Sequence, residues 1–338
     1  MLSQDKLSFL DETCPTVGTT RKSYEVAFRA MEPLEAEWGT DFTLQPREVL
    51  EQAFNESVCS SRYVNAYKTL TLLQKYAKWR VANGLPCGDG IHGVTIDTSY
   101  RMRKTMVSSP LHLLRVLNLA FDPPGQSSPD VLYRAFLWMG FAGLDAGQAV
   151  RVVEEQLDLY ALTITYEGEV FRLPSESVPD FREIASLTGF LEHSARANGT
   201  VYTRSFERVP GNRLMRGRPS QRVLSLDESV TKSIRPFITT KLRQAAARSA
   251  ADPSILQTGL ETSFNYVHLS GQFCRLYELE RLGEAPNFRA LAQADFDKRK
   301  HSDKPYSDWN STYASNTVTR LALFMRNDYN SWKKAFMA

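Results

Sequence analysis

The chain has 338 residues but only four cysteines, and it has no long apolar run. The cysteines are Cys14, Cys59, Cys87 and Cys274. They are too scattered for a zinc site or a disulfide framework, so a reducing cytoplasm is the expected compartment. No apolar stretch approaches the roughly 18 residues of a membrane span. Residues 1–6 lack the basic and apolar segments of a secretory signal, so we expect a cytoplasmic protein.

Repeats and metal-site motifs are also missing. No internal repeat, low-complexity tract or heptad pattern is present, and nothing in the sequence suggests a repeat protein or a coiled coil. No group of carboxylates, histidines or cysteines has metal-site spacing, so we expect no metal and no cofactor. The length and ordinary globular composition fit two domains, each with its own core.

Charge is distributed unevenly along the chain, although the net charge is only +3. Residues 1–60 contain 11 acidic and 5 basic residues, a net charge of −6. Residues 201–251 contain 11 basic and 3 acidic residues, a net charge of +8. This asymmetry fits a protein whose later part meets a polyanion, although a solvated basic loop explains the charge equally well.

Apolar periodicity predicts a small helical domain over residues 21–85, after a tail at residues 1–20. Helices are expected from residue 21, over residues 43–54, and from a cap at Ser60 or Ser61 to about residue 82. The last helix places Lys68, Lys75 and Lys78 opposite its apolar side. These lysines either form a solvated face or contact DNA phosphates.

The sequence predicts a glycine-containing linker with a basic end over residues 86–105. Helices are expected over residues 111–120, 133–141, 146–155, 178–199 and 225–250, and a glycine- and proline-punctuated loop over residues 201–222. Arginines on such a loop can approach phosphates closely, and disorder without a ligand is the alternative. The candidate DNA contacts are Lys68, Lys75, Lys78, Arg101, Arg103, Lys104, Arg204, Arg208, Arg213, Arg216, Arg218, Arg222, Lys241 and Arg243.

The most informative stretch is residues 133–174. An apolar helix leads into Ala142-Gly143-Leu144-Asp145, a second helix leads into Leu157-Asp158, and a hairpin of alternating residues ends at Leu173-Pro174. This order resembles the tyrosine recombinases, or phage integrases. In that family the turn reads T-G-L-R, and a hairpin with a G-K-G-like turn ends in R-x-V-P-L.

The resemblance implies a helical, SAM-like core-binding domain followed by a domain that cleaves DNA through a tyrosine, without metal. It also places acidic or neutral residues at the family's catalytic positions. Asp145 falls on the first arginine, Glu167 and Glu169 flank the turn that should carry a lysine, and Val267 and Ser270 fall on the histidine and arginine of the second box. A carboxylate beside a transferring phosphate opposes the chemistry.

The nucleophile expected from the resemblance is a tyrosine late in the chain. Tyr329 is the candidate and Tyr313 a rival. The segment from Tyr329 onward contains both apolar and basic residues. In the family a terminal helix docks on a neighbouring protomer, so this segment is a candidate dimer contact.

The expected fold is mainly α with a small β-hairpin: a tail (1–20), a core-binding domain (21–85), a linker (86–105) and a recombinase-like domain (106–338). The expected function is sequence-specific binding of double-stranded DNA without cleavage, as a nucleoid-associated regulator or accessory factor of a phage or mobile element. One alternative is an active divergent recombinase that uses Tyr329 as nucleophile, with Arg172, Arg275 or loop arginines as replacement cations. The other is a module that binds an acidic protein partner.

Overall fold

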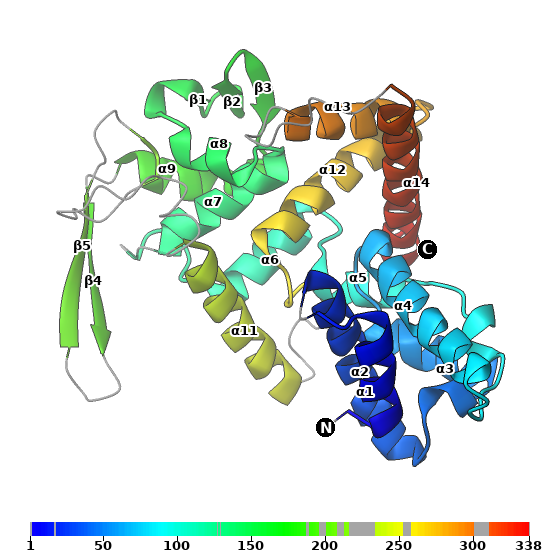
Figure 1. The fold of residues 1–338 in the computed structure, drawn as a ribbon. Helices are drawn as coiled ribbons and strands as arrows, with labels where there is room; N and C mark the ends of the chain where they lie inside the picture. Colours follow the sequence, from blue (N-terminus) through cyan, green and yellow to red (C-terminus); the bar gives the residue numbers. More distant parts are fainter. Residues whose placement is uncertain are drawn as a thin grey trace. The chain divides into compact units, whose positions relative to one another are not determined.

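The chain forms two compact units, one of them built from both ends of the sequence. The computed structural model describes residues 2–16, 18–126, 128, 130–186, 189–195, 201–207, 213–215, 234–252, 258–300 and 311–337. Unit 1 comprises Met1–Met102 and Asn287–Ala338, and unit 2 comprises Arg103–Pro286. The described residues are mainly helical with small antiparallel sheets, which confirms the expected fold class at this coarse level (Figure 1).

Unit 1 has an aromatic core built by its N-terminal helices. These are α1 (Gln4–Thr13), α2 (Thr19–Trp38), α3 (Arg47–Ala53) and α4 (Tyr63–Ala82). The Phe9 ring of α1 packs edge-on against Tyr24 at 5.0 Å and Tyr76 at 5.4 Å between centroids. The first twenty residues are therefore not the expected tail, because Phe9 and Leu10 supply buried apolar surface to the core.

Helix α4 was predicted well in extent but not at its start. It runs over Tyr63–Ala82, and its N-cap is Arg62 rather than Ser60 or Ser61. A distant residue supplies the missing acceptor: Asp328 Oδ1 accepts the Tyr63 N–H at 2.6 Å, and Oδ2 accepts Arg62 Nε at 2.8 Å. Burial raises the pKa of Asp328, while Arg62 and the Tyr63 amide act in the opposite direction.

Asp328 lies in α14 (Ser311–Phe336), which with α13 (Phe288–Lys300) completes unit 1. Phe324 of α14 lies 6.1 Å from the rings of both Tyr63 and Tyr67. Lys334 also pairs with Asp97 at 2.7 Å. The C-terminal helix therefore belongs with the N-terminal helices, which differs from the expected single domain over residues 106–338.

Unit 2 is organised around α7 (Asp130–Ala142), all of whose residues are buried. It packs against α8 (Ala146–Arg151), α9 (Val178–Ser186) and α12 (Phe264–Arg281) (Figure 1). Gly271 lets α12 approach α7 closely, because a Cβ built there would lie 1.9 Å from Phe141 O. On α7 itself, Arg134 Nε and Trp138 Nε1 both donate to the buried Asp180 of α9.

The hairpin expected within residues 133–174 is present and carries a third strand. Strands β1 (Leu157–Asp158), β2 (Thr163–Tyr166) and β3 (Glu169–Arg172) form an antiparallel sheet in that order. Glu167 and Gly168 join β2 to β3 with φ values of 51° and 84°. Positive φ at both turn positions is the geometry that the right-handed twist of a tight hairpin favours.

The helix expected over residues 178–199 is wrong beyond Ser186. Strand β4 (Gly189–Ala195) instead pairs antiparallel with β5 (Val201–Glu207), in the stretch expected to be a loop. The helix or strand propensity of a short segment does not reveal the backbone hydrogen bonds that the segment makes with a partner strand. The described part of the helix expected over residues 225–250 is α11 (Arg235–Ala251), and residues 225–233 lie outside the described residues. Likewise, α8 ends at Arg151 rather than near residue 155.

The remaining described helices of the middle region are α5 (Ser99–Thr105), within the expected linker, and α6 (Pro110–Ala120). Ser109 caps α6 by accepting the His112 N–H. The His112 ring is buried: its Nδ1 lies 3.1 Å from Ser108 N, which donates to it, and its Nε2 lies 3.2 Å from Thr258 O. Since Nδ1 is an acceptor, the neutral ring with its proton on Nε2 satisfies both bonds.

We expect His112 to make unit 2 less stable in acid. Burial lowers the pKa of His112 and nearby Arg115 lowers it further, while the bond to Thr258 opposes them. The unfolded chain then binds more protons, so stability is full above about pH 6.5 and falls as the pH drops from there toward the folded pKa. Urea unfolding of the wild type and His112→Gln between about pH 5 and 7.5 measures this. Equal losses of stability in both proteins would show that His112 does not titrate in this window.

Candidate nucleic-acid interface and the recombinase-like positions

Asp145, at the position of the family's first arginine, is a helix cap. Its Oδ1 accepts the Gln148 N–H at 2.8 Å, and Gln148 Oε1 accepts the Asp145 N–H at 2.9 Å. This reciprocal pair is a capping box that starts α8. The carboxylate therefore stabilises the helix N-terminus and supplies no positive charge for a phosphate.

Two side chains of α12 reach the loop that precedes Asp145. Arg275 Nη1 donates to Phe141 O at 2.8 Å, and His268 Nδ1 lies 3.0 Å from Leu144 O. Gly143, with φ of 118°, makes room for Arg275, whose Nη2 would lie 3.0 Å from a Cβ there. Burial lowers the pKa of Arg275. The motif register placed neither residue here, and only their seven-residue spacing on one helix could have signalled it.

Val267 and Ser270, at the second-box positions, are core residues. Both are fully buried in α12. Ser270 Oγ donates to Tyr266 O at 2.7 Å and accepts the Val107 N–H at 3.1 Å. The hydrogen bond between Ser270 and Val107 holds α12 against the segment that follows α5. Neither residue is placed to contact a ligand.

The hairpin turn carries two carboxylates where the family has a lysine. Glu167 and Glu169 are both exposed. Arg172, also exposed, lies at the other end of β3, opposite Thr163. The turn therefore presents negative charge to solvent.

Tyr329 is inaccessible in the folded chain. Its exposure is 1%, its ring lies 5.6 Å from Phe288 and 6.2 Å from Trp332, and Lys333 Nζ lies 4.9 Å from its centroid. Covalent catalysis needs a hydroxyl that can approach the phosphorus. Tyr329 also belongs to unit 1, whereas Asp145 and Ser270 belong to unit 2. The side chain of Tyr313 lies outside the described residues.

The apolar residues of the C-terminal segment are used within unit 1. Trp332 is fully buried and Ala335 is 9% exposed. The Trp332 ring also lies 5.9 Å from Phe336. Phe336 and Met337 are half-buried, and the dimer contact expected from the sequence stays a prediction.

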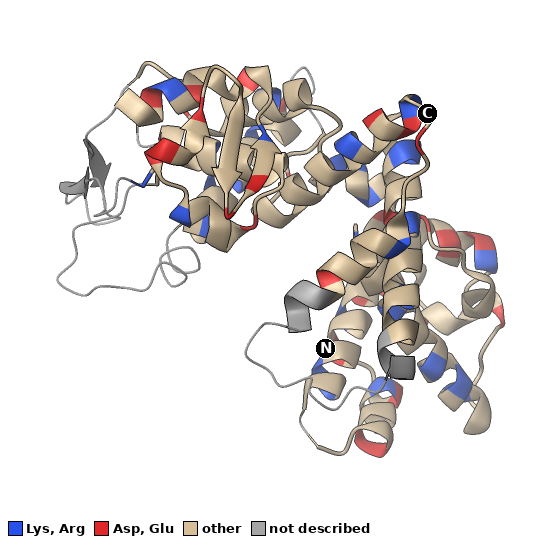
Figure 2. Cartoon of the chain, turned by 90° about the horizontal axis from the view of Figure 1, so that it is seen from above, with Lys and Arg blue, Asp and Glu red and all other residues tan. Residues whose placement is uncertain are grey.

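The three lysines of α4 are where the helical periodicity predicted them. Lys68, Lys75 and Lys78 are exposed, and none forms an ion pair within the part of the chain that the structure describes. Residues seven and three positions apart lie on one helix face, so the ammonium groups share a side of α4. Elsewhere acidic and basic residues are interspersed over the described helices (Figure 2).

The other basic candidates differ in their surroundings. Lys241 pairs with the buried Asp130 at 2.9 Å, so its charge is already compensated. Arg103 and Arg243 are exposed, while Arg101 and Lys104 are half-buried. Arg213 is half-buried in a β-bridge with Val153. The side chain of Arg204 and all of Arg208, Arg216, Arg218 and Arg222 lie outside the described residues.

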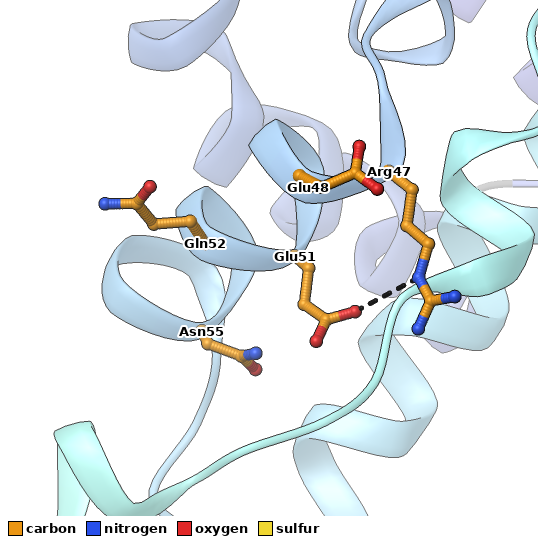
Figure 3. Close-up of a pocket in the computed structure, with 5 residues that line it drawn as sticks. All are labelled: Arg47, Glu48, Glu51, Gln52 and Asn55. Atoms are coloured by element: carbon orange, nitrogen blue, oxygen red, sulfur yellow. Dashed lines mark hydrogen bonds and ion pairs between the residues drawn. The ribbon is translucent and has the colours of Figure 1, made fainter.

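A pocket on α3 offers no catalytic arrangement. It is lined by Arg47, Glu48, Glu51, Gln52 and Asn55. Glu51 Oε2 accepts a hydrogen bond from Arg47 Nε (Figure 3). The same oxygen accepts the Thr95 N–H, so the carboxylate fixes the segment that follows η3 (Gly90–Gly93). These contacts join α3 to the segment around Thr95.

Comparisons with known proteins add no family. No protein-family model matches the chain, and no curated protein matches it. Among the described residues, no helix combines the length and apolar character needed to cross a bilayer.

Proposed function

We propose that this chain binds double-stranded DNA on a tyrosine-recombinase-like scaffold and does not cleave it. In this proposal the N-terminal helices are the core-binding domain, and the protein serves as a regulator or accessory factor of a phage or mobile element. The proposal rests on the lysine face of α4, which forms no ion pair with any other described residue. Three exposed ammonium groups on one helix suit phosphate contacts, which require charge more than exact geometry.

Three local structures support the absence of cleavage. Asp145 is committed to capping α8, Ser270 is buried with both hydrogen-bonding functions of its hydroxyl in use, and Tyr329 is packed in a core. Phosphoryl transfer depends on cations positioned around the phosphorus, and the turn at Glu167 offers carboxylates instead.

Neutralising the lysine face is expected to weaken DNA binding. Lys68→Gln, Lys75→Gln and Lys78→Gln together should lower the salt slope of log K by about three and the affinity roughly tenfold to a hundredfold. Gel-shift titrations at two salt concentrations measure both quantities. A matched control removes three exposed charges from α2 and α13, through Lys22→Gln, Arg29→Gln and Arg289→Gln. Equal losses in the two triple variants would contradict a specific role for α4.

The absence of cleavage has its own test. A nicked duplex that traps phosphotyrosine should give no covalent adduct on a denaturing gel. An adduct that disappears in Tyr329→Phe would overturn this part of the proposal, while site-selective binding without an adduct would support it.

A further inference from the structure

Helices α4 and α14 of unit 1 are almost free of acidic residues. Helix α4 has none, and α14 has only Asp328, which is buried and bonded to Arg62 at the start of α4. Helices α1, α2 and α3 of the same unit contain three, four and two acidic residues, so the lack is specific to this helix pair. The exposed cations of the pair are Lys68, Lys75, Lys78, Arg320, Arg326 and Lys334. Of these, only Lys334 forms an ion pair with another described residue. Positive charge is therefore present on both helices, and a polyanion suits them better than a basic partner.

Aromatic side chains lie where these two helices meet (Figure 1). The ring centroid of Phe324 in α14 lies 6.1 Å from those of Tyr63 and Tyr67 in α4. Tyr67 is nevertheless 45% exposed, and Leu323, beside Phe324 in the sequence, is 54% exposed. The Phe324 ring restricts Tyr67 on one side while much of the Tyr67 side chain stays open to solvent. A ring that is already held in place loses little side-chain entropy when it binds a flat ligand.

Cations flank Tyr67 along both helices. Lys68 follows Tyr67 directly. Lys78 comes three turns later, about 16 Å along the axis and within roughly 20° of Tyr67 around it. On α14, Arg320 lies one turn before Phe324, on the same side of that helix. A single polyanionic strand can therefore contact the Tyr67 ring and several cations at once.

An open aromatic ring beside cations fits a nucleotide whose base is not stacked in a helix. Cations alone are enough for the phosphates of an unbroken duplex, and the base faces of such a duplex are covered by neighbouring base pairs. An unpaired base has a free face, which stacks favourably on an aromatic side chain. The ring thus adds a contact that only DNA with an unpaired base can use.

We propose that Tyr67, supported by Phe324, is a stacking site for an unpaired DNA base. Unit 1 then prefers duplexes that expose such a base over unbroken duplexes. This inference rests on the proposed DNA binding and adds the structural class of DNA that the surface selects. The lysine face supplies affinity through the phosphates, and the ring supplies the preference for the unpaired base.

The test compares two DNA ligands that differ by one base. One duplex carries a single unpaired thymine in one strand, and the other carries an abasic residue at that position, so that charge and backbone are the same. The full chain should bind the thymine duplex about five- to a hundredfold more tightly, the range that base–aromatic stacking gives. Equal affinities for the two DNAs would overturn the stacking site and leave the phosphate contacts of α4 in place. Failure to bind either DNA would contradict the proposed function, and this inference with it.

Substitutions at Tyr67 assign the preference to its ring. Tyr67→Leu should abolish the difference between the two DNAs, while Tyr67→Phe should retain it. Tyr160→Leu, at a fully exposed tyrosine of unit 2, is the matched control and should also retain it. The triple lysine variant should weaken binding to both DNAs and leave their affinity ratio unchanged. If Tyr67→Leu weakens binding to both DNAs equally, the ring only supports α4, and the inference is overturned.

A second copy of the chain is the other occupant that exposed apolar side chains could have. Light scattering without DNA distinguishes the two. Leu323→Asp places a charge beside Phe324 at an exposed position and should leave the mass of the protein in solution unchanged. A mass that falls by half in this variant would make the surface an interface between copies and would contradict the stacking site.

Discussion

Asp180→Asn is expected to destabilise unit 2 by about 3–5 kcal/mol. Asp180 accepts from Arg134 Nε, from Arg134 Nη2 at 3.4 Å and from Trp138 Nε1 at 2.8 Å, and both members of the ion pair are 1% exposed. Removing the negative charge leaves a buried guanidinium without its counterion, and its Nη1 already has no hydrogen-bond partner among the residues that the structure describes. Urea unfolding followed by circular dichroism measures the loss.

The control for Asp180→Asn makes the same substitution at an exposed aspartate, so that the effect of burying the charge can be measured. Asp89→Asn, at an exposed position, should change stability by less than about 0.5 kcal/mol. The double variant Arg134→Met with Asp180→Leu removes both charges and should recover most of the loss, because well-packed apolar residues often replace a buried pair at little cost. A single-variant loss below about 1 kcal/mol would contradict the account of Asp180 as an essential counterion.

Gly271→Ala is expected to cost about 3 kcal/mol or more, against the usual sign of this change in a helix. In an exposed helix the substitution stabilises by about 1 kcal/mol. At Gly271, however, the new Cβ would lie 1.9 Å from Phe141 O, a backbone atom of the buried helix α7. One of the two helices must shift, and interiors packed at crystal density transmit such a shift widely.

Gly140→Ala is the graded comparison for Gly271. Its Cβ would meet the Phe264 ring at 2.8 Å, and a side chain can yield more readily than a backbone. The thermal midpoints should therefore rank wild type, then Gly140→Ala, then Gly271→Ala as the lowest. The reverse order of the two variants would show that α12 has more freedom over α7 than the structure indicates.

Elements with strong local patterns could be predicted from the sequence. Helix α4 has apolar periodicity over its full length, and the β2–β3 hairpin has alternation with glycine at the turn. The strands β4 and β5 were missed because their stabilisation comes from a ladder between two segments. Helix α1 was missed because its segment is polar and only two of its apolar residues, Phe9 and Leu10, are buried.

Assigning roles to the motif positions was harder than locating the elements. The sequence predicted only that Asp145 replaces an arginine of the family. The structure shows that the Asp145 side chain caps the N-terminus of α8. The basic run at Lys68 could be located from periodicity alone, whereas the compensation of Lys241 by Asp130 depends on residues more than a hundred positions apart. The docking of Leu214 beside Val152 likewise depends on a tertiary neighbour that no local pattern reveals.

The bond between Asp328 and the start of α4 has a consequence for biosynthesis. Unit 2 is continuous in sequence, so all of it is synthesised before α13 and α14. Helices α1 to α4 are translated first, yet the acceptor for the Tyr63 N–H arrives only with α14. The hydrogen bonds at the start of α4 therefore form only after α14 has been synthesised. Unit 2 can complete its fold before unit 1 can.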